Sequence, residues 1–247
     1  MAIGESWTLR ASILAFGIAL AGLFIGSGFE KGRSADRYVT VKGVAEREVK
    51  ADLAIWPLTV VTGDNDLAAA NAKIASSIAG VRAFLLRHGL DTAQVALSGF
   101  SVNDANANPY APDRQPTNRF IVRQTMLIRS TKPDLVLAAS QKVSELAAVG
   151  VVISSERGEG VPGGSGPTFV FSGLNKLKPE MIAQATARAR EAAEQFARDA
   201  QSKIGGIRHA NQGVFEILPR DQVSGISEES QIAKIVRVVS TVEYSLR

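Results

Sequence analysis

The chain has 247 residues, of which 45% are apolar and 21% are charged, as in globular proteins and unlike disordered or fibrous ones. The net charge of +4 is not clustered, because Arg188 and Arg190 are followed closely by Glu191 and Glu194. We therefore predict no nucleic-acid partner. The lack of cysteine excludes disulfides, thiolate metal ligands and a cysteine nucleophile.

An uncharged apolar stretch, "ASILAFGIALAGLFIGSGF", follows a short N-terminal segment. As a helix with a rise of about 1.5 Å per residue, it would be nearly as long as the ~30 Å hydrocarbon core of a bilayer. Its Gly-Ser-Gly ending is a poor signal-peptide cleavage site, which favours a retained anchor over a cleaved signal. We predict a short segment over 1–10, a transmembrane anchor in the lipid bilayer over 11–29, and a linker over 30–37.

Charge alone leaves the orientation of this anchor open. Arg10 precedes the apolar stretch, whereas Lys31, Arg33 and Arg37 follow it. By the positive-inside rule, this distribution would keep the bulk of the chain in the cytoplasm. The rule is weak for a long C-terminal domain, which can translocate regardless of nearby charge.

The rest of the chain begins with two predicted strands and a helix. Alternate residues from Val39 to Ala45 are apolar or small and face one way, and residues 52–62 are apolar on both faces, which indicates a central strand. Pro57 cannot donate to a ladder, so we expect a bulge or a free edge there. A helix is predicted over 66–88, ended by Gly89.

Further strands are predicted over 95–102 and 119–130, separated by a loop rich in asparagine and proline. A second helix is predicted over 132–149, where Lys-Pro-Asp opens it. Short strands over 151–154 and 168–171 are expected to flank a glycine-rich loop.

The third helix is predicted from Pro179, at its first position, to about Lys203. Its buried stripe is expected to be mainly alanine, which would let the helix lie close to its sheet or to a neighbouring subunit. The residues of this stripe are Ile182, Ala185, Ala189, Ala192, Phe196 and Ala200. Two strands, near 212–218 and over 234–246, close the chain.

The predicted order is strand–strand–helix, three times with variations, followed by two strands. Antiparallel sheets backed by helices fit this order better than a strictly alternating parallel sheet. We predict an α+β fold of repeated β-α-β-β units after the N-terminal transmembrane helix. No linker is conspicuous enough to divide residues 38–247 into two domains.

No pattern in the sequence indicates a catalytic, cofactor or metal site. The glycines of Gly158–Gly163 match a dinucleotide fingerprint, but a strand follows them instead of a helix, and Glu159 would repel a phosphate. His88 and His209 each lack a second histidine or a carboxylate at ligand spacing. We predict no metal, no cofactor and no enzymatic activity.

Two weaker signals remain. Glu46 and Glu48 share one strand face and could form a carboxylate pair, but neighbouring basic residues favour a solvated charged face over a glycosidase. The loop around Tyr110 and the polar stretch 219–231 are long enough to contact partners.

Three stretches together resemble the SIMPL domain family of bacterial envelope proteins, which includes a periplasmic immunogenic protein and an oxidative-stress defence protein. They are "VTVKGVAEREVKADLA" (39–54), "AQATARAREAAEQFARDAQSKIGGI" (183–207) and "VRVVSTVEYSL" (236–246). The resemblance covers nearly everything after Arg37. It implies export, an α+β fold, assembly into a ring-like homo-oligomer and no established enzymatic activity. It also implies the periplasmic side for the C-terminal domain, against the charge count.

Our leading hypothesis is a non-enzymatic scaffold of the bacterial cell envelope. It would be a single-pass inner-membrane protein with its C-terminal domain in the periplasm, self-associated into a homo-oligomer, with a link to envelope or oxidative stress taken from the relatives. The alternative is a periplasmic binding or chaperone-like module for a small hydrophobic or peptide ligand. That ligand would lie in a concave apolar pocket lined by the second faces of residues 53–61. A hydrolase that uses Glu46 and Glu48 comes third.

Overall fold

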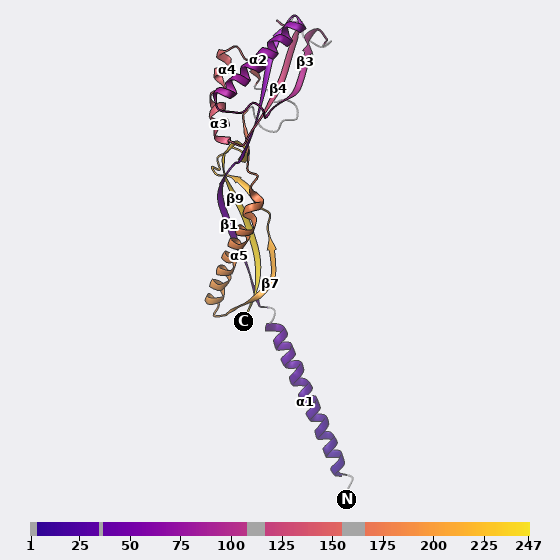
Figure 1. The fold of residues 1–247 in the computed structure, drawn as a ribbon. Coiled ribbons are helices and arrows are strands. Elements are labelled where there is room, and N and C mark those ends of the chain that lie inside the picture. The colour runs from indigo at the N-terminus through magenta and orange to yellow at the C-terminus, as the bar shows by residue number, and fades with distance from the viewer. Residues whose placement is uncertain (1–3, 35–36, 108–116, 155–165) are drawn as a thin grey trace. The chain divides into compact units, whose positions relative to one another are not determined.

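The structure, a computed structural model, describes residues 4–34, 37–107, 117–154 and 166–247 (Figure 1). It divides into two compact units, each made of separate chain segments. Unit 1 comprises Met1–Glu46, Lys178–Phe215 and Arg237–Arg247, and unit 2 comprises Arg47–Leu177 and Glu216–Val236. Most of these divisions fall inside a strand or a helix, so no linker marks them in the sequence.

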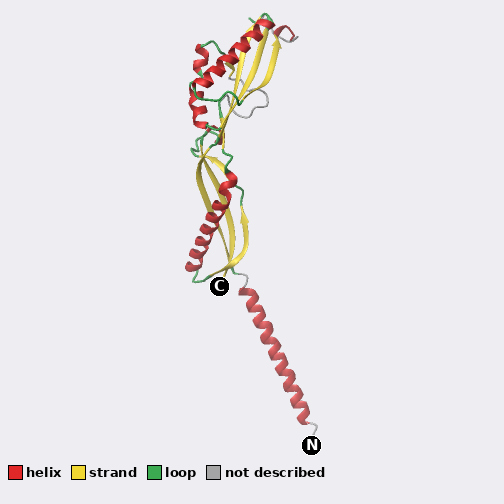
Figure 2. Cartoon of the chain, in the orientation of Figure 1, coloured by secondary structure: helices red, strands yellow, loops and turns green. Residues whose placement is uncertain are grey.

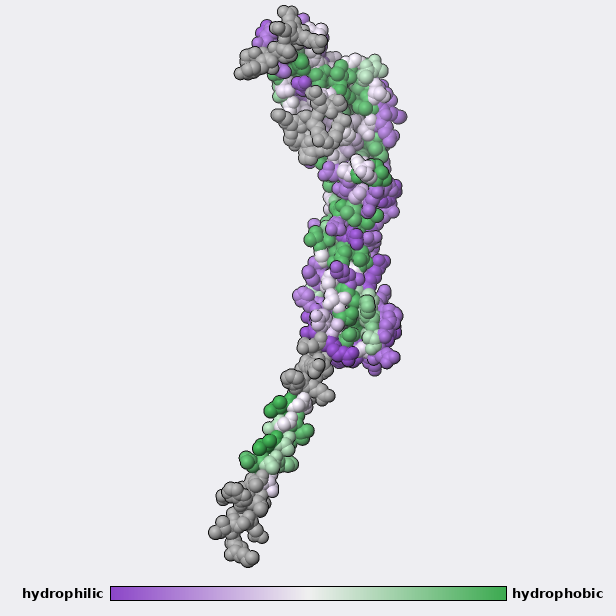
Figure 3. All heavy atoms as spheres, turned by 180° about the vertical axis from the view of Figure 1, so that it is seen from behind, coloured by the Kyte–Doolittle hydropathy of each residue, from purple (hydrophilic) through white to green (hydrophobic). Residues whose placement is uncertain are grey.

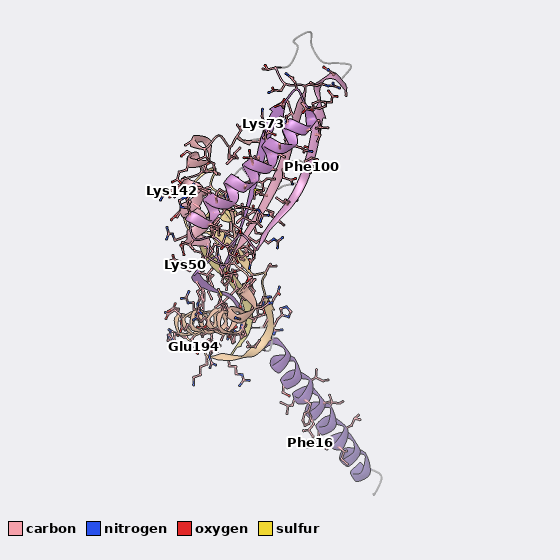
Figure 4. All side chains as sticks on the ribbon, turned by 45° about the horizontal axis from the view of Figure 1, so that its top comes forward. Phe16, Lys50, Lys73, Phe100, Lys142 and Glu194 are labelled. Carbon is pink, nitrogen blue, oxygen red and sulfur yellow. The ribbon has the colours of Figure 1, made fainter. Side chains whose placement is uncertain are left out.

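Helix α1 (Gly4–Ser34) runs without a break across the predicted anchor and into the predicted linker. Every described side chain from Ser12 to Ser27 is exposed, and this part of the helix is largely hydrophobic (Figure 3). Phe16 projects from the helix (Figure 4). Within the described residues, no helix combines the length and the apolar character needed to cross a membrane. The transmembrane anchor over 11–29 is therefore not shown here and stays a prediction.

The first sheet has the strand order β1 (Tyr38–Lys50), β9 (Ala233–Leu246) and β7 (Ile204–Gln212), and β8 (Glu216–Pro219) also pairs with β9. The backbone N of Leu246 donates to Arg37 O at 2.9 Å, and Ala51 N donates to Ile232 O at 2.8 Å. Strands β1 and β9 therefore run in opposite directions, as do β7 and β9. The predicted strand over 234–246 is confirmed as β9, and one of its faces is buried; the buried residues include Val236, Val238, Val242 and Tyr244.

Helix α5 (Leu174–Asp199) packs on this sheet through a stripe of small side chains (Figure 1). A Cβ at Gly43 of β1 would stand 1.8 Å from Ala185 O and 2.5 Å from Ala189 N, so backbone meets backbone here. The buried stripe is Met181, Ala185, Ala189, Ala193 and Ala197. The sequence prediction is confirmed at Ala185 and Ala189. It is wrong at Phe196, which is 59% exposed, and at Ala200, which is exposed and lies beyond the end of the helix, because the close approach favours alanine at a four-residue step.

The predicted start of α5 at Pro179 is wrong, since the helix begins at Leu174. The Asp52 carboxylate accepts hydrogen bonds from Ser172 N at 2.9 Å and from Ser172 Oγ at 2.8 Å, which holds the chain just before the helix. Leu174 is half-buried and supports the extra turn. Pro179 lies exposed in the second turn, where its missing N–H removes a single backbone hydrogen bond.

The second sheet lies in unit 2, in the order β3 (Val95–Asp104), β4 (Phe120–Ser130), β2 (Leu53–Asp64) and β5 (Ile153–Ser154), with β6 (Thr168–Val170) also on β2. All these pairs are antiparallel. Helix α2 (Leu67–Arg87) covers one face (Figure 2), capped by Asp66 and ended by Gly89 at φ +74°. Its core includes Trp56, Phe84, Met126 and Phe169. The predicted α+β fold of antiparallel sheets and helices is confirmed.

Pro57 lies at a gap in the strand pairing. On one edge, β2 pairs with β6 over Leu53–Ile55 and with β5 over Thr59–Val60, and Pro57 falls between them. Val61 N donates to Val152 O at 3.0 Å across this edge. Because N–H groups alternate between the two edges of a strand, the Pro57 nitrogen faces the gap. No described strand pairs with Pro57 on this edge, as expected from the second of the two predicted alternatives, and the pairing with β4 on the other edge is regular.

The single helix predicted over 132–149 is wrong, because α3 (Pro133–Gln141) and α4 (Ser144–Ala148) replace it. Ser140 Oγ donates to Leu137 O at 2.8 Å, a back-bond of the kind that bends helices. Beyond the end of α3, the backbone N–H groups of Lys142 and Val143 bond to carbonyls three residues back. These bonds tighten the turn and end the helix.

The strand predicted near 212–218 is also wrong in its bounds. Strand β7 ends at Gln212, Gly213 N donates to Val239 O at 2.8 Å, and β8 begins at Glu216. Most of β7 is exposed, and its first half contains Gly205 and Gly206. The strand therefore lacks the alternation of apolar and polar residues that would reveal it. Two short 3-10 turns, η1 (Ala105–Ala107) and η2 (Glu228–Ser230), complete the described elements.

Candidate functional site

Unit 2 contains a cavity of about 620 Å³ between the second sheet and the turn that joins α3 to α4. Its floor is the core-facing side of β2, where Trp56 and Leu58 are only 1% and 2% exposed. Its walls include Val143 and Ala147 from the helical turn and the segment 150–154 that leads into β5. A volume of this size lies within the range of small-molecule sites, roughly 300–1,000 Å³.

Helix α4 supplies one wall and is held from two sides. Ala147 lines the cavity, whereas Leu146 is fully buried in the core. Glu145 Oε2 lies 3.1 Å from Nε2 of His88, the residue that caps the end of α2. The His88 ring also lies against the ring of Phe84, with the centroids 4.5 Å apart. These contacts position a helix that is too short to be stable by itself.

Among the described residues, the polar groups of the cavity are few and no charged side chain lines it. Ser140 Oγ is committed to the carbonyl of Leu137. The Ser144 hydroxyl and the Trp56 indole N–H have no hydrogen-bond partner in the described part of the chain. The cavity therefore offers a ligand mainly apolar surface and two unused hydrogen-bond donors.

Comparison with protein families gives a match over most of the chain. Residues 39–241 match the family SIMPL, described as "Protein of unknown function (DUF541)". The chain belongs to the SIMPL family. The matched region contains the whole cavity and most of both sheets, and it confirms the resemblance seen in the sequence. No curated protein matches this SIMPL chain.

Two carboxylates of the SIMPL region, Glu46 and Glu48, were the candidates for hydrolysis. Glu46 Oε1 lies 3.4 Å from Arg237 Nε, and Glu48 Oε1 lies 3.6 Å from Arg220 Nη1. Their side chains are 53% and 62% exposed. This arrangement, with a separate arginine for each carboxylate, favours the solvated charged face over a hydrolytic pair.

The two histidines of the SIMPL region lie on different elements. The prediction that His88 has no carboxylate partner is wrong, because Glu145 reaches it from a helix that is distant in the sequence. His209 lies on β7 opposite Glu243 of β9. Across the described ranges, no group of three or more His, Cys, Asp or Glu side chains is placed to hold a metal ion.

The three predicted loops differ in what the structure describes. Gly158–Gly163 and Tyr110 lie outside the described residues. In the stretch 219–231, the Gln231 side chain accepts from Asp221 N at 3.1 Å and donates to Asp221 O at 2.8 Å. This stretch is therefore closed on itself by one reciprocal amide contact.

Perturbed charges lie on exposed ion pairs and away from the cavity. A hydrogen bond from Arg119 holds the pKa of Asp104 below its usual value, and Lys73 does the same for the pKa of Asp64. Arg220 lowers the pKa of Asp221 in the same way. Each shift comes from a surface pair, so these charges indicate local structure and no chemistry.

Helix periodicity could not reveal the α4 side of the cavity. The prediction of a pocket along residues 53–61 did include Trp56 and Leu58, which now form the floor. Ser144 and Ala147 were missed, because the sequence pattern continues smoothly across the break between α3 and α4.

Proposed function

We propose that this SIMPL chain is a non-enzymatic protein of the bacterial cell envelope, tethered to the inner membrane by α1 and self-associated through its folded units. One observation carries the proposal: Ile13, Phe16 and Phe24 of α1 are 65%, 68% and 73% exposed. Apolar surface left in water costs about 25 cal/mol per Å², which favours an apolar surrounding for this helix. A lipid bilayer would provide such a surrounding for α1, since residues 11–29 carry no charge and, as a helix, approach the thickness of a bilayer core.

The location of the folded units is part of the same proposal. A periplasmic position for residues 38–247 and a link to envelope or oxidative stress have their support in the sequence resemblance to envelope proteins. A single pass of α1 would connect the two sides.

Self-association is supported by the two ends of the first sheet. Strands β1 and β7 are the outer strands of the order β1-β9-β7, so each has one edge that no described strand covers. Such edges pair readily with strands of other chains. A contact between β7 of one copy and β1 of the next is head-to-tail, and it closes into a ring when the rotation between copies permits.

The tether is tested by fractionation of cells that produce the full chain. We expect the wild-type protein to stay in the membrane pellet after extraction with alkaline carbonate. The double substitution Phe16→Glu and Phe24→Glu is expected to release it into the supernatant. The control Phe100→Glu changes an aromatic residue of β3 that is also exposed, at 55%, and should leave the protein in the pellet (Figure 4). Release of the wild type by carbonate would overturn the tether.

Self-association is tested by light scattering on the full chain in detergent. We expect Ile207→Lys, on the exposed strand β7, to lower the mass of the assembly, because a charge on an edge strand opposes pairing. Val214→Lys, in the turn after β7 and 84% exposed, is the matched control and should not change it. A wild-type monomer at micromolar concentration contradicts this part of the proposal.

Binding of a small hydrophobic ligand, the alternative function, has separate support in the cavity beside Trp56. The two functions are compatible, because α1 and the cavity use different residues.

A further inference from the structure

We infer that the cavity of unit 2 binds an uncharged, largely apolar small molecule that carries a hydrogen-bond acceptor. The inference makes the alternative function specific, and it depends on neither the tether nor self-association. Its basis is the position of Trp56 and Leu58 of β2 opposite Ala147 of α4, around a space of about 620 Å³.

The walls of this site are held in place by contacts outside the cavity. Trp56 and Leu58 belong to the same core cluster as Phe84 and Leu146. The His88–Glu145 contact holds α4 against the end of α2 at 3.1 Å. Preformed walls favour binding, because a ligand then orders few side chains on entry.

The described lining of the cavity carries no charged side chain, and this favours an uncharged ligand. Among the residues that the structure describes, the cavity lining contains no lysine, arginine, histidine, aspartate or glutamate. An ionised group that entered would lose its hydration and find no opposite charge, which is strongly unfavourable. A neutral molecule loses little on entry and covers the apolar surface of Leu58, Val143 and Val151.

Two donors in the lining select the polar group of the ligand. The indole N–H of Trp56, a residue of the cavity lining, has no hydrogen-bond partner in the described part of the chain. The Ser144 hydroxyl, at the first residue of α4, also has no partner there. A carbonyl, ether or ester oxygen of the ligand would satisfy one of these donors.

Fluorescence of Trp56 tests the site in the full chain. The sequence has two tryptophans, so Trp7→Phe leaves Trp56 as the only one. The probe is 4-benzoyloxy-TEMPO, a neutral, mostly apolar nitroxide with an ester, which quenches tryptophan on contact. We expect saturable quenching in detergent solution. Quenching that rises without saturation, as from probe dissolved in the micelle, overturns the inference.

Two neighbouring alanines of α4 provide a matched pair of variants. Both are exposed, but Ala147 lines the cavity and Ala148 does not. Ala147→Phe is expected to weaken saturable binding at least about tenfold, whereas Ala148→Phe leaves it unchanged. Thermal unfolding by circular dichroism verifies that both variants fold. Equal binding by the two variants places the probe elsewhere and overturns the site.

The charge of the ligand is tested by comparing a neutral probe with a charged one. A probe of the same shape with a carboxylate on the benzoyl ring should show no saturable quenching, and Ser144→Ala should weaken the neutral probe about fivefold. Equal binding of the charged probe overturns the class. If saturable quenching is absent while the protein still resists carbonate extraction, the cavity inference is wrong and the tether is unaffected. If quenching is saturable but carbonate releases the protein, the tether is wrong and the cavity inference is unaffected.

Discussion

Gly43 shows how one residue sets the distance between β1 and α5. A side chain at this position would stand 1.8 Å from the backbone oxygen of Ala185. We expect Gly43→Ala to lower the free energy of unfolding by about 3 kcal/mol or more, because the helix must move away and lose its packing. Urea unfolding measures the loss. Gly206→Ala is the control, since a Cβ at Gly206 meets nothing within 4 Å; equal losses in the two variants contradict the close approach.

Lys234 is a buried charge at the start of β9. Its side chain is fully buried, and its ammonium group bonds to the carboxylate of Glu228 and, at 2.6 Å, to the backbone oxygen of Glu228. Glu228→Ala is expected to cost about 3 kcal/mol, because it leaves the ammonium group buried without its opposite charge. Lys234→Met removes the charge and keeps the apolar stem, so it should cost less. Denaturant unfolding of both variants measures the two losses of unfolding free energy. A larger loss for Lys234→Met than for Glu228→Ala would contradict this account.

Asp104 is expected to make the stability of the folded protein depend on pH in the acid range. The hydrogen bond from Arg119 lowers the pKa of Asp104 in the folded protein, and the backbone N–H of Asn106 lowers it further. The ionised form therefore favours folding: this contribution is present at neutral pH and is lost as the pH falls below about 4, through the folded pKa. Asp104→Asn should melt below the wild type at neutral pH and converge with it as the pH falls through the lowered pKa of Asp104. A melting difference that is constant with pH contradicts the prediction.

At the scale of elements, α4 depends on contacts with other parts of unit 2. The side chains of His88 and Glu145 are 17% and 43% exposed, so their interaction is partly shielded from solvent. A double-mutant cycle with His88→Ala and Glu145→Ala should give a coupling of about 1 kcal/mol. The exposed pair Arg190–Glu194 on α5 is the reference, with about 0.3–0.5 kcal/mol expected. A coupling no larger than this reference would mean that the contact does not position α4.

Local pattern predicted most elements and missed those that depend on packing. Helix α2 was predicted close to its observed bounds and with its glycine stop, because apolar periodicity and the stop signal act between residues that are close in the chain. Strand β7 was missed, since its exposed residues carry no alternation, and only pairing with β9 makes it a strand. The break between α3 and α4 was missed for a related reason: a serine back-bond is one of several options for that side chain.

At the scale of the whole molecule, the source of self-association can be separated from the tether. No described residue of α1 belongs to either hydrophobic core. A chain that begins at Arg37 should therefore stay folded, and it should keep the assembly mass of the full chain if sheet edges drive association. Light scattering without detergent measures that mass. A folded monomer would assign association to α1 instead.

The division into two units belongs to the same scale. Strands β1 and β9 and helix α5 each contribute residues to both units, so the chain returns to each unit after leaving it. The composition of the chain does not reveal this division. A linker would consist of residues that belong to neither unit, whereas here most boundaries between the units fall inside strands or a helix.

By itself, the sequence determined the α+β class, the family and the approximate bounds of strands such as β2 and β9, because the alternation of apolar and polar residues acts between residues that are close in the chain. Only the tertiary structure decided the bounds of α5, the pairing of His88 with Glu145, and the cavity between Trp56 and Ala147. Each of these joins residues that are distant in sequence, and their contact energies appear only when helices and sheets pack together.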